Sequence, residues 1–130
     1  MNRYKQREQA LLLTFESQFH DISAEEICTL FEESVEELGA YSKTLFNGVY
    51  DNKDELDAKI EAFARGWRLS RIPKINIAIL RIALYEIQYV DDVPASVAVN
   101  EAVELAKKYS GSDDASFING ILGSFVRSLS

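Results

Sequence analysis

The sequence is poor in the residues on which several classes of protein depend. Among its 130 residues there is one cysteine, Cys28, and one histidine, His20, so an internal disulfide is impossible and a histidine-based metal site or catalytic triad is not expected. Proline occurs only at Pro73 and Pro94, and no segment alternates polar and apolar residues as a strand would. A lone thiol is typical of a reducing compartment, and we expect a cytoplasmic protein.

Long apolar runs and catalytic motifs are also absent. The N-terminal segment turns apolar only from Ala10 to Leu13, and the most apolar stretch, residues 74–90, is interrupted by Arg81 and Glu86. Neither is long enough for a signal-peptide core or a membrane span. There is no glycine-rich phosphate loop, nucleophile elbow or HExxH motif. The sequence therefore predicts no membrane association, no cofactor or metal, and no enzymatic activity.

What is present indicates an all-α chain. Hydrophobic residues make up 47% of the sequence and charged residues 27%, a balance typical of a folded protein. Apolar residues recur every three to four positions, and Pro and Gly separate the periodic segments. We expect about seven helices in two small bundles that share a core, forming a single domain over residues 1–130, with an N-terminal half of about 1–66 and a C-terminal half of about 67–130. The expected helices cover about 3–17, 41–50 and 74–90. A second helix is expected to begin at Ser23, and a fourth is expected between Asn52 and Gly66. The sixth has Pro94 in its first turn, and the last follows the loop of residues 110–114.

Four local expectations follow from the helical pattern. In the second helix, Ser23 and Glu26 form a capping box at the start, and Gly39 is expected to end the helix. The fifth helix is apolar on nearly every side, so it is expected at the centre, where Arg81 and Glu86 each require a partner. The residues expected to be buried in the second helix are Ile27, Leu30, Phe31, Val35 and Leu38. Glu104 and Lys108 are expected to pair on the sixth helix.

The net charge of −7 is distributed unevenly. Residues 16–62 hold thirteen acids against three lysines, whereas residues 65–81 hold five bases and no acid. The first eight residues add Arg3, Lys5 and Arg7 against one acid. Such segregation can orient an anionic partner on one face. The same charges also suffice simply to keep a domain soluble, so charge alone leaves both interpretations open.

Single-stranded RNA is one anionic ligand that the residues allow. Flexible cations at the chain start can contact phosphates, while recognition of bases needs exposed aromatic rings and polar groups. The candidates for that second role are Tyr4, Tyr109, Phe117 and Asn119. From the residues alone the chain is a helical binding module with RNA as a candidate ligand.

Four segments resemble the NusB family, which is bacterial. In the C-terminal half these are IAILRIALYEI (77–87), DDVPASVAVNEAVELAKKYS (91–110) and FINGILG (117–123), and REQALLLTFES (7–17) resembles the family's opening helix. The resemblance implies two helical bundles around a shared core. It also implies an RNA-binding transcription antitermination factor that pairs with the ribosomal protein NusE and binds single-stranded boxA RNA. With NusA, NusG and RNA polymerase, such a factor suppresses termination, notably in ribosomal RNA operons.

The resemblance further implies site residues. Asn76 and Arg81 fall where the contact with NusE is expected, and Phe15 stands where the family commonly has tyrosine. The positions associated with RNA binding are Arg3, Lys5, Arg7, Phe15, Arg81, Tyr109, Asp113, Phe117 and Asn119. Two alternatives stay open: a protein-only helical adaptor or homodimer without significant RNA binding, and an accessory domain of an RNA-modifying enzyme.

Overall fold

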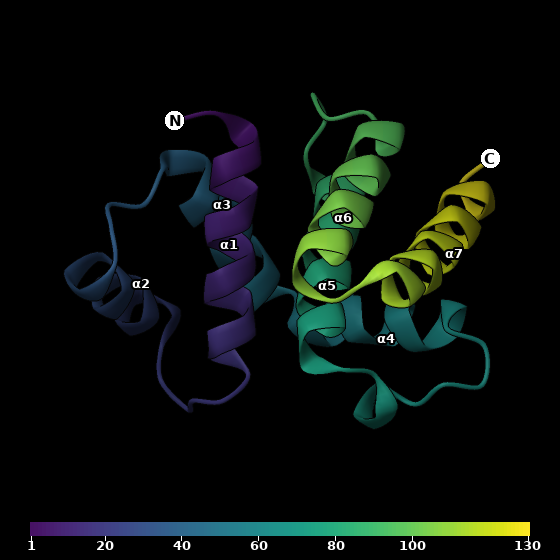
Figure 1. Ribbon diagram of the computed structural model, residues 1–130, viewed down its shortest axis with the longest axis horizontal. Coiled ribbons are helices and arrows are strands. Elements are labelled where there is room, and N and C mark those ends of the chain that lie inside the picture. Colours follow the sequence, from purple (N-terminus) through teal and green to yellow (C-terminus); the bar gives the residue numbers. More distant parts are fainter.

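The computed structural model describes all 130 residues and contains only helices (Figure 1). Seven α-helices and one 3-10 helix, η1, follow one another along the chain. Their bounds are α1 (Arg3–Ser17), α2 (Ala24–Ser34), α3 (Ala40–Asp51), α4 (Lys53–Phe63), η1 (Leu69–Arg71), α5 (Lys74–Tyr89), α6 (Ala95–Tyr109) and α7 (Ser112–Ser128). The all-α class and the seven helices predicted from the sequence are confirmed. None of these helices combines the length and the apolar character that crossing a membrane would require.

The helix α5 occupies the centre of the molecule, as its apolar surface predicts. It packs against α1, α3, α4, α6 and α7, and nine of its sixteen residues are buried. The helices α1, α2 and α3 lie on one side of Figure 1, and α4, α6 and α7 lie with α5 on the other. In sequence α4 falls within the N-terminal half, yet in space it packs mainly against α5 and α7.

A second, smaller hydrophobic cluster holds α1, α2 and α3 together. It is built from Leu13, Ile27, Cys28, Leu38 and Phe46. The lone cysteine is thus a core residue, and burial raises the pKa of its thiol. A buried thiol with a raised pKa is a poor nucleophile, which agrees with its interpretation as a small apolar side chain.

The end of α2 differs from the sequence prediction. At the start of α2, the Ser23 hydroxyl accepts a hydrogen bond from the Glu26 backbone N–H at 3.1 Å. At its other end, the helix stops at Ser34 instead of continuing to Gly39. Gly39 is instead the N-cap of α3, where a Cβ atom would lie 2.2 Å from the Gln6 side chain. Two residues predicted to be buried are exposed: Leu30 by 51%, on a side of α2 that no other element covers, and Val35 by 63%, directly after the helix end.

Candidate nucleic-acid interface

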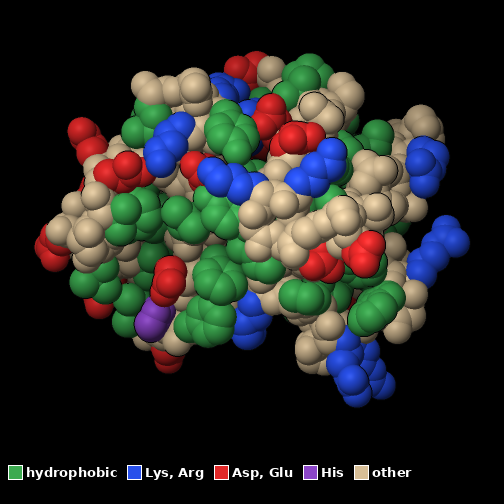
Figure 2. Space-filling view, viewed as in Figure 1, with side chains coloured by type: hydrophobic (Ala, Val, Ile, Leu, Met, Phe, Trp, Pro, Cys, Tyr) green, Lys and Arg blue, Asp and Glu red, His purple; other side chains and the backbone are tan.

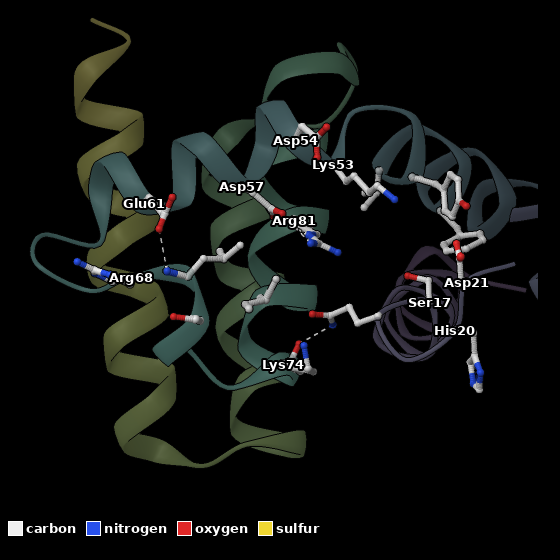
Figure 3. Close-up of a pocket in the computed structure, with 17 residues that line it drawn as sticks. Ser17, His20, Asp21, Lys53, Asp54, Asp57, Glu61, Arg68, Lys74 and Arg81 are labelled. Carbon is white, nitrogen blue, oxygen red and sulfur yellow. Dashed lines mark hydrogen bonds and ion pairs between the residues drawn. The ribbon is translucent and has the colours of Figure 1, made fainter. Parts of the chain in front are cut away.

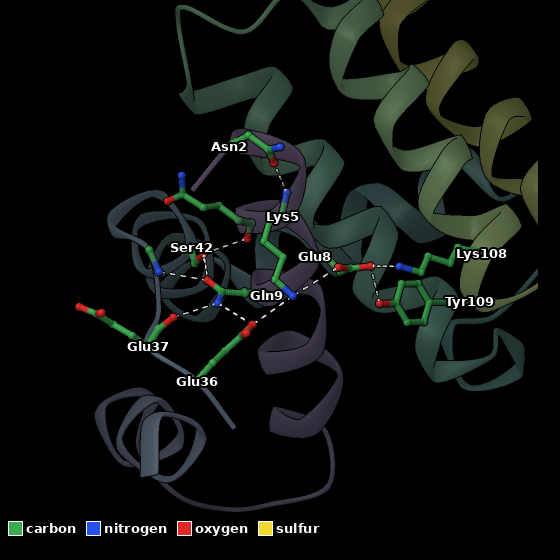
Figure 4. Close-up of polar contacts among 11 residues, drawn as sticks. Asn2, Lys5, Glu8, Gln9, Glu36, Glu37, Ser42, Lys108 and Tyr109 are labelled. Carbon is green, nitrogen blue, oxygen red and sulfur yellow. Dashed lines mark hydrogen bonds and ion pairs between the residues drawn. The ribbon is translucent and has the colours of Figure 1, made fainter. Parts of the chain in front are cut away.

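A buried carboxylate, Glu8 of α1, joins the N-terminal helices to α6 (Figure 4). Its Oε2 accepts hydrogen bonds from the Lys108 ammonium and, at 2.7 Å, from the Tyr109 hydroxyl. Lys5, one turn earlier in α1, lies 3.8 Å from Oε1. The expected pair of Glu104 with Lys108 does not form. Lys108 instead pairs with Glu8, and Lys107 forms an ion pair with Glu104 at 3.4 Å. We call the contact of Glu8 with Lys5, Lys108 and Tyr109 the Glu8 seam.

The Glu8 carboxylate stays ionised in this seam. Burial raises its pKa, but the hydrogen bonds from Lys108 and Tyr109 and the charges of Lys108 and Lys5 outweigh that effect, so the pKa lies below its ordinary value. Burial and the hydrogen bond to Glu8 raise the pKa of Tyr109 to about 12. The side chains of Lys5 and Lys108 remain 43% and 53% exposed. Glu8 therefore fixes two cations and an aromatic ring side by side at the surface.

Arg7 does not belong to this surface, although the sequence indicated it as a phosphate contact. Its side chain is only 6% exposed, and its Nε donates to both oxygens of Glu86 in α5, at 3.0 and 2.9 Å. The Tyr41 hydroxyl donates to the same carboxylate. The Arg7 guanidinium is thus enclosed by protein partners and cannot reach a phosphate. Arg3 is exposed, with its guanidinium 3.9 Å from the centre of the Tyr41 ring and 3.3 Å from Asp92.

The second aromatic site lies between α4 and α5. Arg65 and Gly66, with φ values of 29° and 84°, turn the chain after α4 and lead into an irregular segment. There Trp67 is 52% exposed, and its ring centre lies 5.6 Å from that of Phe117 in α7, in an edge-on arrangement. A surface hollow beside them is lined by Gly66, Trp67, Arg68, Ser70 and Arg71. Two aromatic rings and two free cations therefore lie together.

The helix α7 separates the site residues that the sequence placed on it. Asp113 and Phe117 are four residues apart and share one face, whereas Asn119 is turned by about 200° from Phe117. Asn119 is exposed and lines a groove between α6 and α7 together with Asn100 and Lys107. Asp113 and Phe117 thus belong with Trp67, and Asn119 does not.

Two further predicted residues lie away from any RNA-facing surface. Asn76 is fully buried in the first turn of α5, where its Oδ1 accepts the Ser110 hydroxyl at 2.8 Å. The resemblance implied that Asn76 contacts NusE. Because the connection between α6 and α7 covers Asn76, it cannot make that contact directly. Phe15, near the end of α1, is half-buried and lies edge-on against Phe19, with 5.0 Å between ring centres.

Arg81 lies in a polar cavity of about 610 Å³ between the two groups of helices (Figure 3). Its guanidinium donates to both oxygens of Asp57 in α4, at 2.7 and 2.8 Å. The other charged residues that line the cavity are His20, Asp21, Lys53, Asp54, Glu61, Arg68 and Lys74.

The Glu8 seam and the Trp67 site meet at the start of α7. Tyr109 ends α6, and the short connection of Ser110 and Gly111 leads directly to Asp113. In Figure 2, lysine and arginine side chains lie over the α1 and α6 region and project at the lower right, where Figure 1 has the segment between α4 and α5. We call this surface the basic–aromatic face and define it by Lys5, Lys108, Tyr109, Asp113, Phe117, Trp67, Arg68 and Arg71.

Three residues of the Glu8 seam and the Trp67 site were not predicted from the sequence. Trp67 was not among the predicted site residues, because a single aromatic in an aperiodic segment carries no pattern. Lys108 was paired with a neighbour on its own helix, and Glu8 was not considered. The basic stretch of residues 65–81 was the sequence feature that could have indicated the site around Trp67.

The comparison with known sequences gives a single answer. The model of the NusB family matches residues 4–127. The chain is 46% identical over 130 residues to the transcription antitermination protein NusB of Acetivibrio thermocellus, covering 98% of this chain and 90% of the relative. It is 42% identical over 132 residues to the protein of the same name from Clostridium novyi, covering 98% of this chain and 99% of the relative.

Solved structures agree with this fold. T. maritima NusB superposes with a TM-score of 0.86 at 28% identity, over 98% of this chain and 92% of that one. A NusB chain from a complex of the antitermination factors NusB and NusE with double-stranded RNA superposes with a TM-score of 0.84 at 22% identity, over 98% and 99% of the two chains. With matching helices, matching length and substantial identity throughout, the chain belongs to the NusB family of transcription antitermination proteins.

Proposed function

We propose that this protein is an RNA-binding adaptor that pairs with the ribosomal protein NusE and binds boxA-type single-stranded RNA. In this role it joins NusA and NusG on RNA polymerase in the cytoplasm and suppresses termination, notably in ribosomal RNA operons, without catalysis of its own. The observation that carries the proposal is the pair of Trp67 and Phe117 beside Arg68 and Arg71, two cations without ion-pair partners in the segment between α4 and α5, which we call the linker.

The basic–aromatic face has the chemistry that an unpaired RNA strand requires. An exposed indole offers a surface on which a base can stack, which is worth about 1–3 kcal/mol per base. Arg68, Arg71, Lys5 and Lys108 supply cations for the phosphates. Asp113 would repel a phosphate, but its carboxylate can accept hydrogen bonds from the amino group of a base. The face therefore combines affinity for the backbone with a means of reading bases.

The polar cavity around Arg81 suits a protein partner better than RNA. Four carboxylates line it, those of Asp21, Asp54, Asp57 and Glu61, and they disfavour a phosphate backbone. Cations and carboxylates alternate around the cavity, as in surfaces that recognise another protein through complementary charge. We assign this cavity to NusE, with Arg81 and Asp57 as the central pair.

The relatives support NusE and RNA as the two partners. Proteins similar to this chain carry the name transcription antitermination protein NusB, and a solved NusB of the same fold was captured with NusE and double-stranded RNA. The proposed ligand of this chain is a single strand, because Trp67 and Phe117 can stack only on bases that are not paired within a duplex.

Fluorescence anisotropy with labelled RNA tests the proposal. A boxA-like strand, a scrambled strand and a duplex are each titrated with the protein, alone and with NusE. We expect the boxA-like strand to bind most tightly, and NusE to strengthen that binding. Arg81→Ala should weaken the gain from NusE, while Lys43→Ala, at a residue that does not line the cavity, serves as the matched control.

Two results would overturn the proposal. Equal and negligible affinity for all three RNAs, with and without NusE, would leave a protein-only adaptor. Concentration-dependent dimerisation in sedimentation, together with loss of RNA binding, would favour a homodimer instead.

A further inference from the structure

We propose that a groove between α1 and α2 is the docking site for a basic amphipathic helix of a partner protein other than NusE. The groove has a volume of about 440 Å³, and eight of its eleven lining residues are hydrophobic. It lies on the N-terminal group of helices, away from the basic–aromatic face. The lining residues are Leu12, Leu13, Phe15, Glu16, His20, Ile22, Ile27, Leu30, Phe31, Ser34 and Val35.

The helix α2 carries more apolar surface than the protein itself covers. Ile27 and Cys28 are buried against α1 and α3, but Leu30 and Val35, beside them, stay 51% and 63% exposed. An apolar stripe of this width is typical of a helix packed on both flanks. Here one flank faces solvent, and the floor beneath it is formed by buried Leu13. The exposed half of the stripe is therefore available to a second helix.

Acidic side chains lie along one edge of this apolar surface. Glu26 and Glu33 lie four residues before and three residues after Leu30, so both flank it on the same side of α2. Neither takes part in an ion pair. Residues 8–42 contain nine acids and no lysine or arginine. In Figure 2, hydrophobic side chains lie among carboxylates over α2.

The cations that approach from other elements do not neutralise this rim. Lys43 of α3 pairs with Glu32 at 3.7 Å, and Lys5 pairs with Glu36 at 3.1 Å. His20 lies 3.2 Å from Glu16 at the end of α1. The unpaired carboxylates of Glu26 and Glu33 therefore keep their negative potential beside Leu30.

An apolar groove with an acidic rim selects its occupant by charge and shape. A helix with leucine-sized residues at i, i+3 or i+4, and i+7 can place them along the groove, and lysine or arginine on the flank nearer α2 can meet Glu26 and Glu33. RNA is disfavoured by the same carboxylates. The NusE cavity lies on the other side of α1, and the two sites share only His20. This proposal is therefore independent of the proposed function.

Nuclear magnetic resonance titration of the ¹⁵N-labelled protein tests the proposal. The probe is a synthetic 15-residue helix with a leucine face and lysine flanks, and the matched peptide carries glutamate in place of lysine. We expect amide shift changes concentrated in the second half of α1 and in α2, and weaker binding of the glutamate peptide. Leu30→Asn should weaken binding about tenfold, as truncation of a central apolar contact does.

The control variant is Val97→Asn, which removes an exposed apolar side chain from α6 and should leave the affinity unchanged. Both substituted residues are exposed, so the fold is retained. Shift changes spread over all acidic helices, or equal affinity of Leu30→Asn and the wild type, would overturn the proposal. Sedimentation showing that Leu30→Asn abolishes a homodimer would assign the groove to a second copy and would overturn it as well. RNA binding by Leu30→Asn should equal that of the wild type, which separates this test from the proposed function.

Discussion

Arg7 in α1 and Glu86 in α5 form an almost completely buried ion pair, in which the Arg7 Nε lies 3.0 and 2.9 Å from the two carboxylate oxygens. The two residues are 79 positions apart in sequence, and their contact ties the first helix to the central one. Tyr41 of α3 donates to the same carboxylate, and burial together with this hydrogen bond raises the pKa of Tyr41. Three helices thus converge on one carboxylate.

Removing one partner of this pair is expected to destabilise the fold. Arg7→Met leaves the Glu86 carboxylate buried without its cation, which costs roughly 3–5 kcal/mol in the free energy of unfolding. The double variant Arg7→Met, Glu86→Leu removes both charges and should recover much of that loss. Urea denaturation of the three proteins measures the effect. A single variant as stable as the wild type would show that the pair is not enclosed as described.

The same burial makes a prediction for RNA. In conditions where the Arg7→Met protein is folded, the slope of log affinity against log salt should equal that of the wild type, because the guanidinium contacts no phosphate. Anisotropy titrations over a range of salt concentrations measure this slope. A smaller salt slope for Arg7→Met than for the wild type would show that Arg7 contacts a phosphate.

The Glu8 seam predicts a dependence of stability on pH. The pKa of Glu8 is lower in the folded protein than its ordinary value of 4.5, so the unfolded chain binds the proton more readily. The contribution of Glu8 to stability is therefore complete above that ordinary value and is lost as the pH falls through the folded-state pKa. The stability difference between wild type and Glu8→Gln should be constant from pH 8 to 6 and shrink below about pH 4.5.

Urea unfolding at several pH values measures this difference. Glu104→Gln, at an exposed residue paired with Lys107, is the control and should change little at any pH. A difference between wild type and Glu8→Gln that grew on acidification would contradict the arrangement in Figure 4.

The linker arginines are expected to carry phosphate contacts that Arg7 does not. Arg68→Gln and Arg71→Gln should each weaken binding to all RNAs and lower the salt slope by about 0.7, the value for one contact with a single strand. Lys43→Gln, in α3 on the N-terminal side, is the control. Salt slopes identical to the wild type in both arginine variants would exclude the linker from the interface.

The helices of this protein could be predicted well because their signals are local. The bounds of α1 match the expectation, and the apolar surface of α5 correctly indicated a central helix. The end of α2 could not be predicted, because Leu38 continues the apolar period although the chain has already left the helix at Ser34. Gly39 looked like a helix end for the same reason, whereas contact with Gln6 requires the glycine there.

The site was harder to predict because its geometry depends on contacts distant in sequence. Arg3, Lys5 and Arg7 look alike as cations near a helix start, and only Glu86 distinguishes the buried one from the exposed ones. Asn76 likewise reads as a surface residue until Ser110 covers it. The resemblance implied Phe117 and Asp113 as RNA-binding positions, and the structure places both on one face of α7. Their neighbour Trp67 lies in a segment without periodicity.

The fluorescence of Trp67 tests the central claim, that RNA stacks on the basic–aromatic face. Trp67 is the only tryptophan in the chain and is half exposed, so its emission reports this one position. We expect a boxA-like strand, added with NusE and corrected for the emission of NusE alone, to quench the tryptophan in step with binding followed by anisotropy. Phe117→Leu should reduce the quenching. Saturating RNA binding with unchanged Trp67 emission would contradict the account.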